Sequence, residues 1–389
     1  MRIGIDARTI LSPEKSDSIG SGHYTYQLVR HILDLDKTNE YVLFFDHRVR
    51  DKDARKFKRN NVKVVFYPFS DYKKYLPGAY SEVLGLATLQ KENLDLLHVT
   101  SPDSRIPVGY HGKKIVTFSD LSFFGIPNCY PSMKREFAKI GSRYMAQRAD
   151  KIIAISNSVK DELQGFLNVS PEKIDVIYGG FDERFLDSSD AKKERVLGKY
   201  GVRGKYILFL GTIEPSKNVT RLIQAFAKFK KSFLKKNGKK KNFEYQLILA
   251  GKKGWLADEY IQIARDFDVI DDIILTGYVI GDELSVLFRN ADFFVAPFLY
   301  GSFGGGVLEA FATKTPAIVS RIPSFVEIAD DAVIFIDPLD TDGLSDAMLQ
   351  LCCDSKKKKE LSEKGFSQIE RFNWKKAAKE TIELYERMV

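Results

Sequence analysis

Short runs of apolar residues alternate along this chain with longer segments in which apolar residues recur every three to four positions. Short, continuous apolar runs are typical of strands buried on both faces of a parallel sheet, and the longer spacing is typical of helices. A parallel sheet needs such a helix between consecutive strands. The pattern therefore predicts repeated βα units and a doubly wound α/β fold.

The strand-like runs form two series, which predict two Rossmann-like domains. Between them, 181–204 lacks strand periodicity and is predicted as a hinge or linker. The first series predicts an N-terminal domain over 1–180, with strands at 2–6, 40–46, 62–68, 94–100, 113–120, 151–156 and 174–180. The second predicts a C-terminal domain over 205–365, with strands at 205–211, 245–251, 271–277, 292–298, 315–321 and 332–337.

Helical spacing is clearest at 25–35, 144–151 and 220–236. The last segment, 366–389, contains a strongly amphipathic stretch at 374–389, whose pattern alone does not say which domain it joins.

Length and composition agree with two packed domains. The chain has 389 residues, of which 44% are hydrophobic, so it exceeds one ordinary core and can bury two. Its start shows no secretory leader, and no apolar run approaches the roughly 20 residues that cross a bilayer, so we expect a cytoplasmic protein. Cys129, Cys352 and Cys353 suit neither a disulfide framework nor a zinc site, and we expect reduced thiols.

Ligands of open α/β sheets bind at the carboxyl ends of the strands, so the turns after strands are the places to search. The first turn ends in GSGHYTYQLV (20–29), where Gly22 and His23 open a helix whose amides could face an anion. A dinucleotide motif would place glycine at position 25, which is Thr25, although Asp46 keeps a nicotinamide alternative open. His23 fits either a surface loop or an active site.

The turn GTIEPSKN (211–218) places a cation at the start of a helix. Gly211 ends a buried run, and Lys217 lies just before a helix predicted from about Val219. A lysine there can pair with a diphosphate beside the positive end of the helix. The alternative is an exposed loop lysine with Asn218 as the helix cap.

The segment 297–320 predicts a strand, a glycine-rich loop and a helix. Gly304, Gly305 and Gly306 let the backbone approach a ligand and leave amides free for phosphate or sugar oxygens. Glu309, in the first turns of the helix, could accept hydrogen bonds from ribose hydroxyls. Alternatively, it is a helix-start carboxylate stabilised by the helix dipole.

Many ordered segments of the chain resemble one family. It is similar to the retaining family-four glycosyltransferases (glycosyl transferases group 1), which transfer sugars from nucleotide donors. The likeness implies a GT-B fold, with two Rossmann-like domains facing across a cleft and a closing helix that crosses back to the N-terminal domain. It is carried by RIGIDART, GSGHYTYQL, TFSDLSF, ADKIIAISNSVKDEL, KIDVIYGGFD, YILFLGTIEPSKNVTRLIQAF, LILAGKKGW, IILTGYV, ADFFVAPFLYGSFGGGVLEAFATKTPAIVS and RFNWKKAAKETIELY.

The resemblance also implies roles for individual residues. It places Lys217 on the donor diphosphate and Glu309 on the donor ribose, with Gly22 facing the donor from the first domain. The residues that would line the sugar, the phosphates and the base are Phe303, Gly304, Gly305, Gly306, Gly211, Gly277, Tyr278 and Val279.

Several positions depart from the family pattern. Gly301 stands where the first of two glutamates is usual, and Ser119-Asp120 replaces the usual His-Asp pair. Ser216 replaces an arginine of the lysine loop, and His23 replaces the arginine of the first loop. The departures leave open a catalytically degenerate nucleotide-sugar-binding protein, or another GT-B enzyme such as an epimerase.

A retaining, metal-independent transfer is the predicted chemistry. The leaving nucleoside diphosphate would be stabilised by Lys217 and by amides of 304–306. Ser119 and Asp120 would lie at the reacting end, with Asp120 orienting acceptor or sugar. Asp-x-Asp pairs at 34–36 and 51–53 fall on a predicted helix and in a basic loop, so no metal site is expected.

The donor base and sugar stay open. GDP-mannose is the first expectation by family likeness and a UDP-sugar the second, with no cofactor. The acceptor is expected to be a glycan or a lipid-linked sugar. The net charge of +8 suits an anionic partner; we expect no nucleic acid. The basic run 48–64 is a candidate for peripheral contact with the inner face of an anionic membrane, whereas 229–241 and 355–359 are expected to be solvated.

Overall fold

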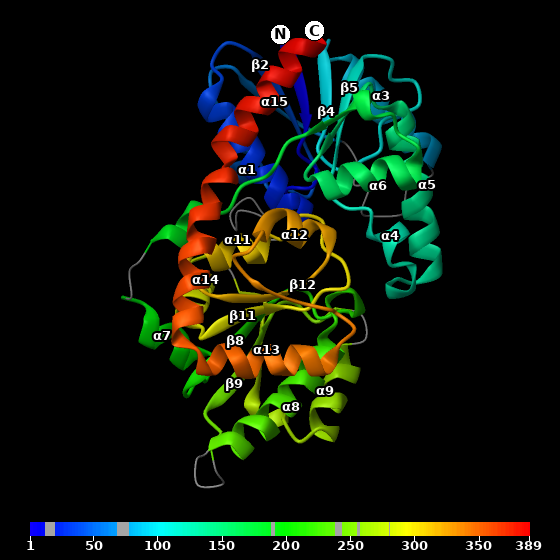
Figure 1. Ribbon diagram of the computed structural model, residues 1–389. Helices are drawn as coiled ribbons and strands as arrows, with labels where there is room; N and C mark the ends of the chain where they lie inside the picture. Colours follow the sequence, from blue (N-terminus) through cyan, green and yellow to red (C-terminus); the bar gives the residue numbers. More distant parts are fainter. Residues whose placement is uncertain (12–19, 68–77, 188–190, 238–242, 255–256, 280) are drawn as a thin grey trace. The chain divides into compact units, whose positions relative to one another are not determined.

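The computed structural model describes residues 1–389 except 12–19, 68–77, 188–190, 238–242, 255–256 and 280 (Figure 1). The chain divides into two compact units. The first comprises Met1–Gly180 together with Phe372–Val389, and the second comprises Phe181–Arg371.

The first unit is built on a seven-stranded sheet of order β3-β2-β1-β4-β5-β6-β7. All of its pairs are parallel, and Ile3 to Asp6 of β1 pair with both neighbouring strands. Its strands are β1 (Arg2–Asp6), β2 (Glu40–Phe45), β3 (Val62–Phe66), β4 (Leu96–Val99), β5 (Lys113–Phe118), β6 (Lys151–Ala154) and β7 (Ile174–Val176). Its helices are α1 (Gly20–Leu35), α2 (Asp51–Ala54), α3 (Gly78–Gln90), α4 (Ser122–Gly125), α5 (Ser132–Arg148), α6 (Asn157–Leu167) and α15 (Trp374–Met388).

The second unit repeats the plan with a six-stranded parallel sheet of order β10-β9-β8-β11-β12-β13. Its strands are β8 (Lys205–Leu210), β9 (Tyr245–Ala250), β10 (Ile273–Gly277), β11 (Phe293–Ala296), β12 (Ala317–Ser320) and β13 (Ile334–Ile336). Its helices are α7 (Lys193–Lys199), α8 (Val219–Asn237), α9 (Ala257–Asp266), α10 (Asp282–Asn290), α11 (Gly305–Ala312), α12 (Pro323–Ala329), α13 (Thr341–Cys353) and α14 (Ser355–Gln368).

Helices cover both faces of the second sheet (Figure 1). On one face α8 packs between α13 and α9. Apolar side chains of these helices meet those of the strands in a core that includes Phe226, Phe229 and Tyr245. On the other face α11 packs against α10 and α14. Two layers of helices on a parallel sheet confirm the doubly wound fold predicted for each half of the chain.

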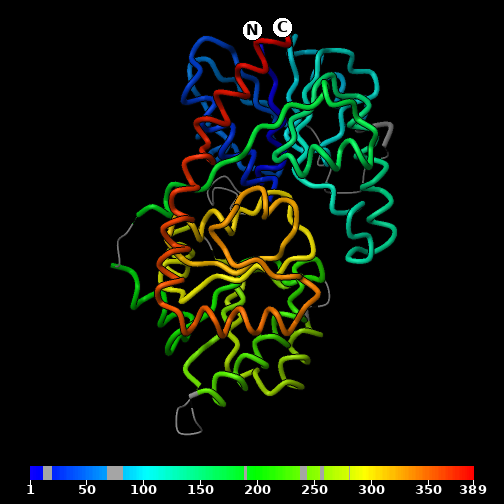
Figure 2. Tube along the Cα trace, in the orientation of Figure 1, coloured from blue at the N-terminus to red at the C-terminus, as the bar shows by residue number. Residues whose placement is uncertain are grey.

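The C-terminal helix α15 belongs to the first unit. Its buried residues, Trp374, Ala378, Thr381 and Tyr385 among them, recur at three-to-four spacing and therefore share one face. That face packs against α1, and Figure 2 shows the C-terminal segment in red running beside the N-terminal one in blue.

Two segment boundaries differ from the sequence prediction. The stretch 181–204, predicted as a linker, lies in the second unit, where α7 packs against α10 and a short 3-10 helix, η5 (Glu183–Leu186), packs against α10 and α11. The second unit also continues past 365 to Arg371, because α14 remains packed on α11.

The helix expected at 144–151 ends at Arg148 and begins at Ser132. No helix within the described residues is both long and apolar enough to cross a bilayer.

Candidate functional site

Three glycines stand at the carboxyl ends of three adjacent strands of the second unit. Gly211 follows β8, Gly251 follows β9, and Gly277 closes β10. A Cβ atom on Gly251, whose φ is +153°, would lie 1.9 Å from the carbonyl oxygen of Gly211. The amide of Gly251 also donates to the carbonyl of Gly277 at 2.9 Å. The backbones of the turns after these strands therefore pack directly against one another, without intervening side chains. Sequence reasoning missed Gly251, although a glycine ending all three apolar runs was the available signal.

The loop that carries Lys217 is held against its neighbour by backbone hydrogen bonds. The amide of Ile213 donates to the carbonyl of Lys252 at 2.9 Å, and the amide of Gly254 donates to the carbonyl of Ile213 at 3.1 Å. Lys217 ends a 3-10 turn, η6 (Pro215–Lys217). Its Cγ would lie 3.6 Å from a Cβ on Gly211, so the half-buried lysine passes directly over the end of β8.

The residue after Lys217 anchors the loop through its side chain. Asn218 adopts the left-handed conformation, with φ +58°. Its side-chain Nδ2 donates to the carbonyls of Pro297 and Pro338, at 2.9 and 2.6 Å. Asparagine tolerates this conformation better than most residues. Asn218 directly precedes α8, and its carbonyl accepts from the amide of Leu222 at 3.2 Å. Its side chain ties the lysine loop to the ends of β11 and β13.

Ser216, which stands in place of an arginine of the family, is 2% exposed. Its hydroxyl donates to Oε1 of Glu214 at 2.6 Å. Its carbonyl accepts from the amide of Leu299 at 3.0 Å. The serine is part of the internal structure of the loop.

Two phenylalanines connect this loop to the glycine-rich one. The ammonium of Lys217 lies 4.7 Å from the ring centroid of Phe298, and this ring lies 5.7 Å from that of Phe325. A Cβ on Gly301 or on Gly304 would lie 3.0 or 3.1 Å from the ring of Phe325. Position 301, where a glutamate is usual, is thus pressed against an aromatic ring. Neither phenylalanine was predicted as a site residue.

The helix that follows offers backbone amides to a ligand. Gly304, with φ +87°, occupies the N-cap of α11. Its carbonyl accepts from the amides of Val307 and Leu308. Among the described residues, no acceptor pairs with the amides of Gly305 and Gly306. Amides at a helix start bind anions because they carry the positive end of the helix dipole.

Glu309 lies beside these amides. Its side chain is partly exposed, but Oε2 is buried and accepts no hydrogen bond from the described residues. A Cβ on Gly305 would lie 3.6 Å from this oxygen. Burial raises the pKa of Glu309 to about 8, and the negative charge of Asp182 adds to the rise. A helix dipole contributes only about 0.3–1 kcal/mol in the opposite direction; burial therefore prevails over the stabilisation that the alternative interpretation proposed.

Tyr278 and Val279 directly follow β10. The ring of Tyr278 lies under the ammonium of Lys252, 4.8 Å from its centroid, and Val279 is buried. Phe303 is partly buried in the glycine-rich loop. The structure thus gathers the predicted residues of the C-terminal half at the carboxyl ends of β8, β10 and β11.

The other predicted residues lie in the first unit. Hydroxyls of Thr9, Thr25 and Thr100 form a hydrogen-bonded chain, and Thr100 donates to the carbonyl of Asp6. This chain fixes the start of α1 above β1 and β4. Gly22 is buried there.

His23, two residues before Thr25, packs its ring edge-on against Trp374, with centroids 6.3 Å apart. After β5, Asp120 accepts from the amide of Ser122 at 2.7 Å. Ser119 is partly buried and Asp120 is exposed. Ser119 and Asp120 stay predictions for the reacting end, and Gly22 and His23 stay predictions for contact with the donor.

Carboxylates that could suggest other cofactors have protein partners. Asp36 accepts from Thr38, Asn39 and Tyr41. Asp51 and Asp53 pair with cations of their own helical segment. Asp46, the residue of the nicotinamide alternative, is paired with Arg48 at 2.9 Å.

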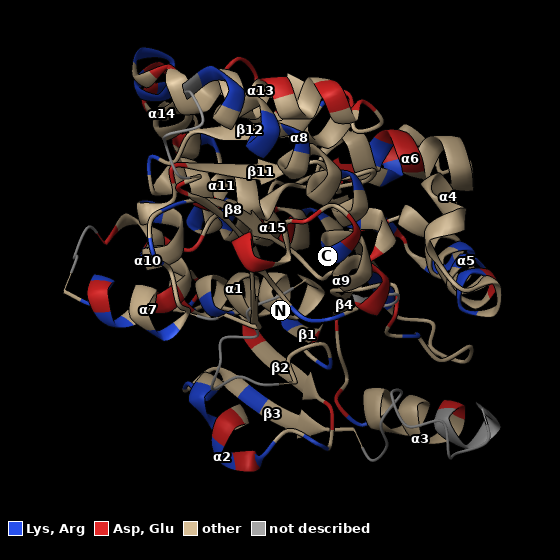
Figure 3. Cartoon of the chain, turned by 90° about the horizontal axis from the view of Figure 1, so that it is seen from below, with Lys and Arg blue, Asp and Glu red and all other residues tan. Residues whose placement is uncertain are grey.

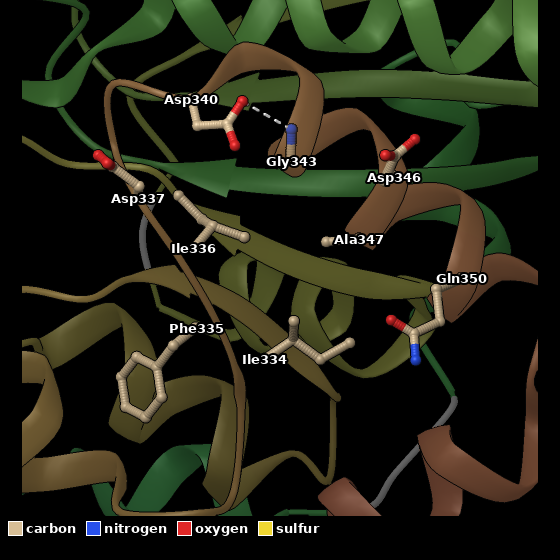
Figure 4. Close-up of a pocket in the computed structure, with 9 residues that line it drawn as sticks. All are labelled: Ile334, Phe335, Ile336, Asp337, Asp340, Gly343, Asp346, Ala347 and Gln350. Carbon is tan, nitrogen blue, oxygen red and sulfur yellow. Dashed lines mark hydrogen bonds between the residues drawn. The ribbon is translucent and has the colours of Figure 1, made fainter.

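A separate cavity of about 470 Å³ lies along the edge strand β13 (Figure 4). Asp340 caps α13 there by accepting from the amide of Gly343 at 2.9 Å, and Asp337 accepts from the amide of Leu339. These carboxylates are engaged in local structure. The residues that line this cavity are Ile334, Phe335, Ile336, Asp337, Asp340, Gly343, Asp346, Ala347 and Gln350.

Known proteins resemble the chain over both halves. The family model for Glycosyltransferase Family 4 matches residues 19–185, and that for Glycosyl transferases group 1 matches residues 191–368. O-antigen chain mannosyltransferase B of Escherichia coli is 28% identical over 274 residues, which cover 70% of each chain.

Solved structures show the same fold. Sucrose-phosphate synthase of Thermosynechococcus elongatus is 17% identical, with a TM-score of 0.77 over 99% of this chain and 98% of its own. Anabaena HepE, in complex with UDP and glucose, is 15% identical, with a TM-score of 0.73 over all of both chains.

The two matched regions together cover most of both parallel-sheet units. The chain therefore belongs to the GT-B glycosyltransferases of family four, with a group 1 C-terminal half.

Proposed function

We propose that this glycosyltransferase transfers mannose from a nucleoside diphosphate donor to a glycan or lipid-linked acceptor, without a metal ion and with retention of configuration. The relative named as a mannosyltransferase supports the choice of sugar. The UDP bound to Anabaena HepE keeps uracil as a candidate base beside guanine. GDP-mannose is the first donor to test and UDP-hexoses are the second.

One observation carries the proposal: Glu309 holds a buried carboxylate oxygen beside the amides of Gly305 and Gly306 at the start of α11, and none of these groups has a hydrogen-bond partner within the described part of the chain. A buried acceptor without a donor costs about 1–3 kcal/mol. A ribose supplies two hydroxyl donors, and a diphosphate supplies acceptors for the amides. Lys217, on the adjacent strand end, adds a positive charge. A nucleoside diphosphate satisfies all three groups at once.

In the proposed transfer, the bond between the anomeric carbon and the diphosphate oxygen breaks, and its electron pair stays with the diphosphate. The acceptor oxygen bonds to the anomeric carbon on the face that the leaving group vacates, and its proton passes to the departing oxygen. Lys217 and the amides of Gly305 and Gly306 stabilise the charge that develops there. One such donor is worth about 3–4 kcal/mol of barrier.

The predicted residues of the first unit divide between the reacting end and the donor. Asp120 follows β5 and is exposed, so its carboxylate is assigned to orienting a hydroxyl of the acceptor or sugar, with Ser119 beside it. Gly22 and His23 are assigned to contact with the donor, with Tyr278 and Val279 flanking the base. If Asp120→Asn transfers sugar at the unaltered rate, the role of Asp120 is wrong.

Thermal unfolding with GDP, UDP, ADP and their sugar conjugates tests donor binding. A ligand at 100 times its Kd stabilises the folded protein by about 2.7 kcal/mol. We expect one base to raise the Tm, and Lys217→Ala and Glu309→Ala to abolish the shift. Lys228→Ala is the matched control, because Lys228 lies in the same unit and pairs with Asp342 on the surface. Absence of a shift with every nucleotide would contradict the proposal.

Transfer itself is tested with the donor that binds. NMR of the product reports the anomeric configuration, and an assay in excess chelator reports metal dependence. We expect the α-linked donor to give an α-linked product at an undiminished rate. Inversion, or loss of activity that added Mg²⁺ or Mn²⁺ restores, would overturn those parts of the proposal. Tight nucleotide binding without transfer would favour a degenerate binding protein.

A further inference from the structure

Helix α5 carries a stripe of large apolar side chains on its exposed face. Met133, Phe137 and Ile140 expose 73%, 61% and 59% of their surface. Residues at this spacing share one face of a helix. The residues that α5 buries, Ser142, Met145 and Ala146, lie on the opposite face at about 100° per residue. Packing of α5 onto the first unit therefore does not account for the stripe.

The helix that carries the stripe is rich in cations, and Figure 3 shows blue segments along α5. The helix contains Lys134, Arg135, Lys139, Arg143 and Arg148 but one acidic residue, Glu136. Glu136 pairs with Arg135 at 2.8 Å and lies 4.0 Å from Lys139. The helix therefore keeps an excess of positive charge.

Aromatic residues of neighbouring segments extend the same surface. The charged groups of Lys139 and Arg143 lie 5.4 and 5.3 Å from the ring centroid of Phe124. Phe124 stacks on Phe166, which is 40% exposed, with centroids 5.5 Å apart. Long cationic side chains can lie along apolar surface while their charged ends reach outward. The result is an apolar face with a basic rim.

The basic run 48–64, the candidate membrane contact from the sequence, is differently built. Six of its eight cations are paired with carboxylates: Arg48 with Asp46, Arg50 and Lys56 with Asp53, Arg55 with Asp51, Arg59 with Asp34, and Lys63 with Glu92. Its large apolar residues, including Phe57 and Val62, are buried. It offers an anionic surface less free charge than α5 and no apolar stripe.

We propose that α5 docks the first unit onto the surface of an anionic lipid bilayer, with Met133, Phe137 and Ile140 inserted among the acyl chains near the headgroups. An amphipathic helix with a basic polar side binds such an interface by itself. Each lysine or arginine near an anionic leaflet adds attraction. A stable protein interface instead needs about 800 Å² per partner, spread over about 20–30 residues, whereas this stripe consists of three side chains on one helix.

The docked surface lies close to the predicted acceptor residues. Helix α4 begins two residues after Asp120 and packs against α5. Docking through α5 would therefore bring the carboxyl end of β5 near the membrane, where a lipid-linked acceptor would be presented. This last step rests on the proposed function, but membrane docking itself does not.

The test measures flotation of the full chain with phosphatidylcholine vesicles that contain or lack phosphatidylglycerol. We expect binding to the anionic vesicles that weakens as salt is raised, because salt screens the charge attraction. A variant with Met133→Ser, Phe137→Ser and Ile140→Ser should lose about tenfold or more in partitioning, since each buried apolar side chain adds strongly to insertion. Lys134→Gln with Arg143→Gln should weaken binding to anionic vesicles alone.

Matched controls use the same substitutions elsewhere. Leu186→Ser, Leu275→Ser and Leu339→Ser remove three exposed apolar residues of the other unit, and Lys52→Gln with Arg55→Gln removes charge from the run 48–64. Both controls should float as the parent chain does.

Failure to bind any vesicle, or binding that survives the α5 triple variant, would overturn the proposal. So would a lipid-free dimer, seen by sedimentation, that the triple variant abolishes. The nucleotide-induced Tm shift should be unchanged in the triple variant, so failure of docking is distinguishable from failure of the proposed function.

Discussion

Single residues at the candidate site carry the departures from the family, and the structure shows what replaces them. Gly301 lies against the ring of Phe325, and Ser216 is buried in a hydrogen bond to Glu214. Both positions are therefore filled by the local packing of this chain. The substitutions are compensated by neighbours rather than left as gaps.

Gly301→Ala tests this packing. The added methyl would lie 3.0 Å from the Phe325 ring and 3.3 Å from Ile322. We expect a loss of about 1–3 kcal/mol in the free energy of unfolding, measured in urea, as for overpacked cores. Gly198→Ala, in α7 of the same unit, meets nothing within 4 Å and should gain about 0.5–1 kcal/mol. Equal changes in the free energy of unfolding for the two variants would show that the Phe325 ring moves aside without cost.

Glu309 predicts a pH dependence of stability. Burial raises its pKa from about 4.5 to about 8, so the folded chain keeps a proton that the unfolded chain releases in this window. The contribution of this group to stability is complete below about pH 4.5 and is lost as pH rises through about 8. Between these two pH values the free energy of unfolding falls by up to about 1.4 kcal/mol per pH unit.

Glu309→Gln should remove this dependence, because an amide does not ionise. Urea unfolding at pH 5 and pH 8 would measure this dependence. Relative to the parent chain, the free energy of unfolding of the variant should be higher at pH 8 than at pH 5. A constant difference between the two proteins across the range would contradict a raised pKa.

Elements were predicted more fully than contacts. Each strand expected from the apolar runs is present, because a strand buried on both faces appears in the sequence as a continuous run of apolar residues. The first half of α5 was not predicted, since its apolar residues face away from the core and do not mark a buried stripe. Gly251, Phe298 and Phe325 were missed because their roles depend on loops brought together only by the sheet. The carbonyl partners of the Asn218 side chain, Pro297 and Pro338, could not be predicted because they lie far from it in the sequence.

The loop between β8 and α8 should depend on Asn218 in two separable ways. Asn218→Gly keeps the left-handed backbone accessible but removes the donors to Pro297 and Pro338, which should cost about 1–3 kcal/mol. Asn218→Ala should cost about 1–2 kcal/mol more, because a Cβ disfavours this conformation. Urea unfolding of both variants measures the difference. If alanine and glycine destabilise equally, the backbone strain assigned to position 218 is wrong.

At the scale of the whole molecule, the chain leaves the first unit at Gly180 and returns to it at Phe372. The return is specific. Tyr385 of α15 is fully buried, and its hydroxyl lies 2.5 Å from Nδ1 of His98 in β4, whose Nε2 lies 2.7 Å from the Thr117 hydroxyl. Burial lowers the pKa of His98 to about 3, so the ring is neutral and this hydrogen-bond chain is insensitive to physiological pH.

This path of the chain predicts unequal autonomy of the two units. Residues 181–371 are continuous and hold Lys217, Glu309 and the start of α11, so this fragment should fold and bind the same nucleotide as the full chain, within about tenfold in Kd, or 1.4 kcal/mol. Residues 1–180 alone lack α15, which would expose the face of α1 that it covers, and should unfold far more readily than the same segment joined to 372–389. Calorimetry measures nucleotide binding by the first fragment, and urea titration compares the other two. A folded 181–371 fragment that cannot bind a nucleotide held by the full chain would show that the first unit supplies an essential donor contact, with Gly22 and His23 the first residues to substitute.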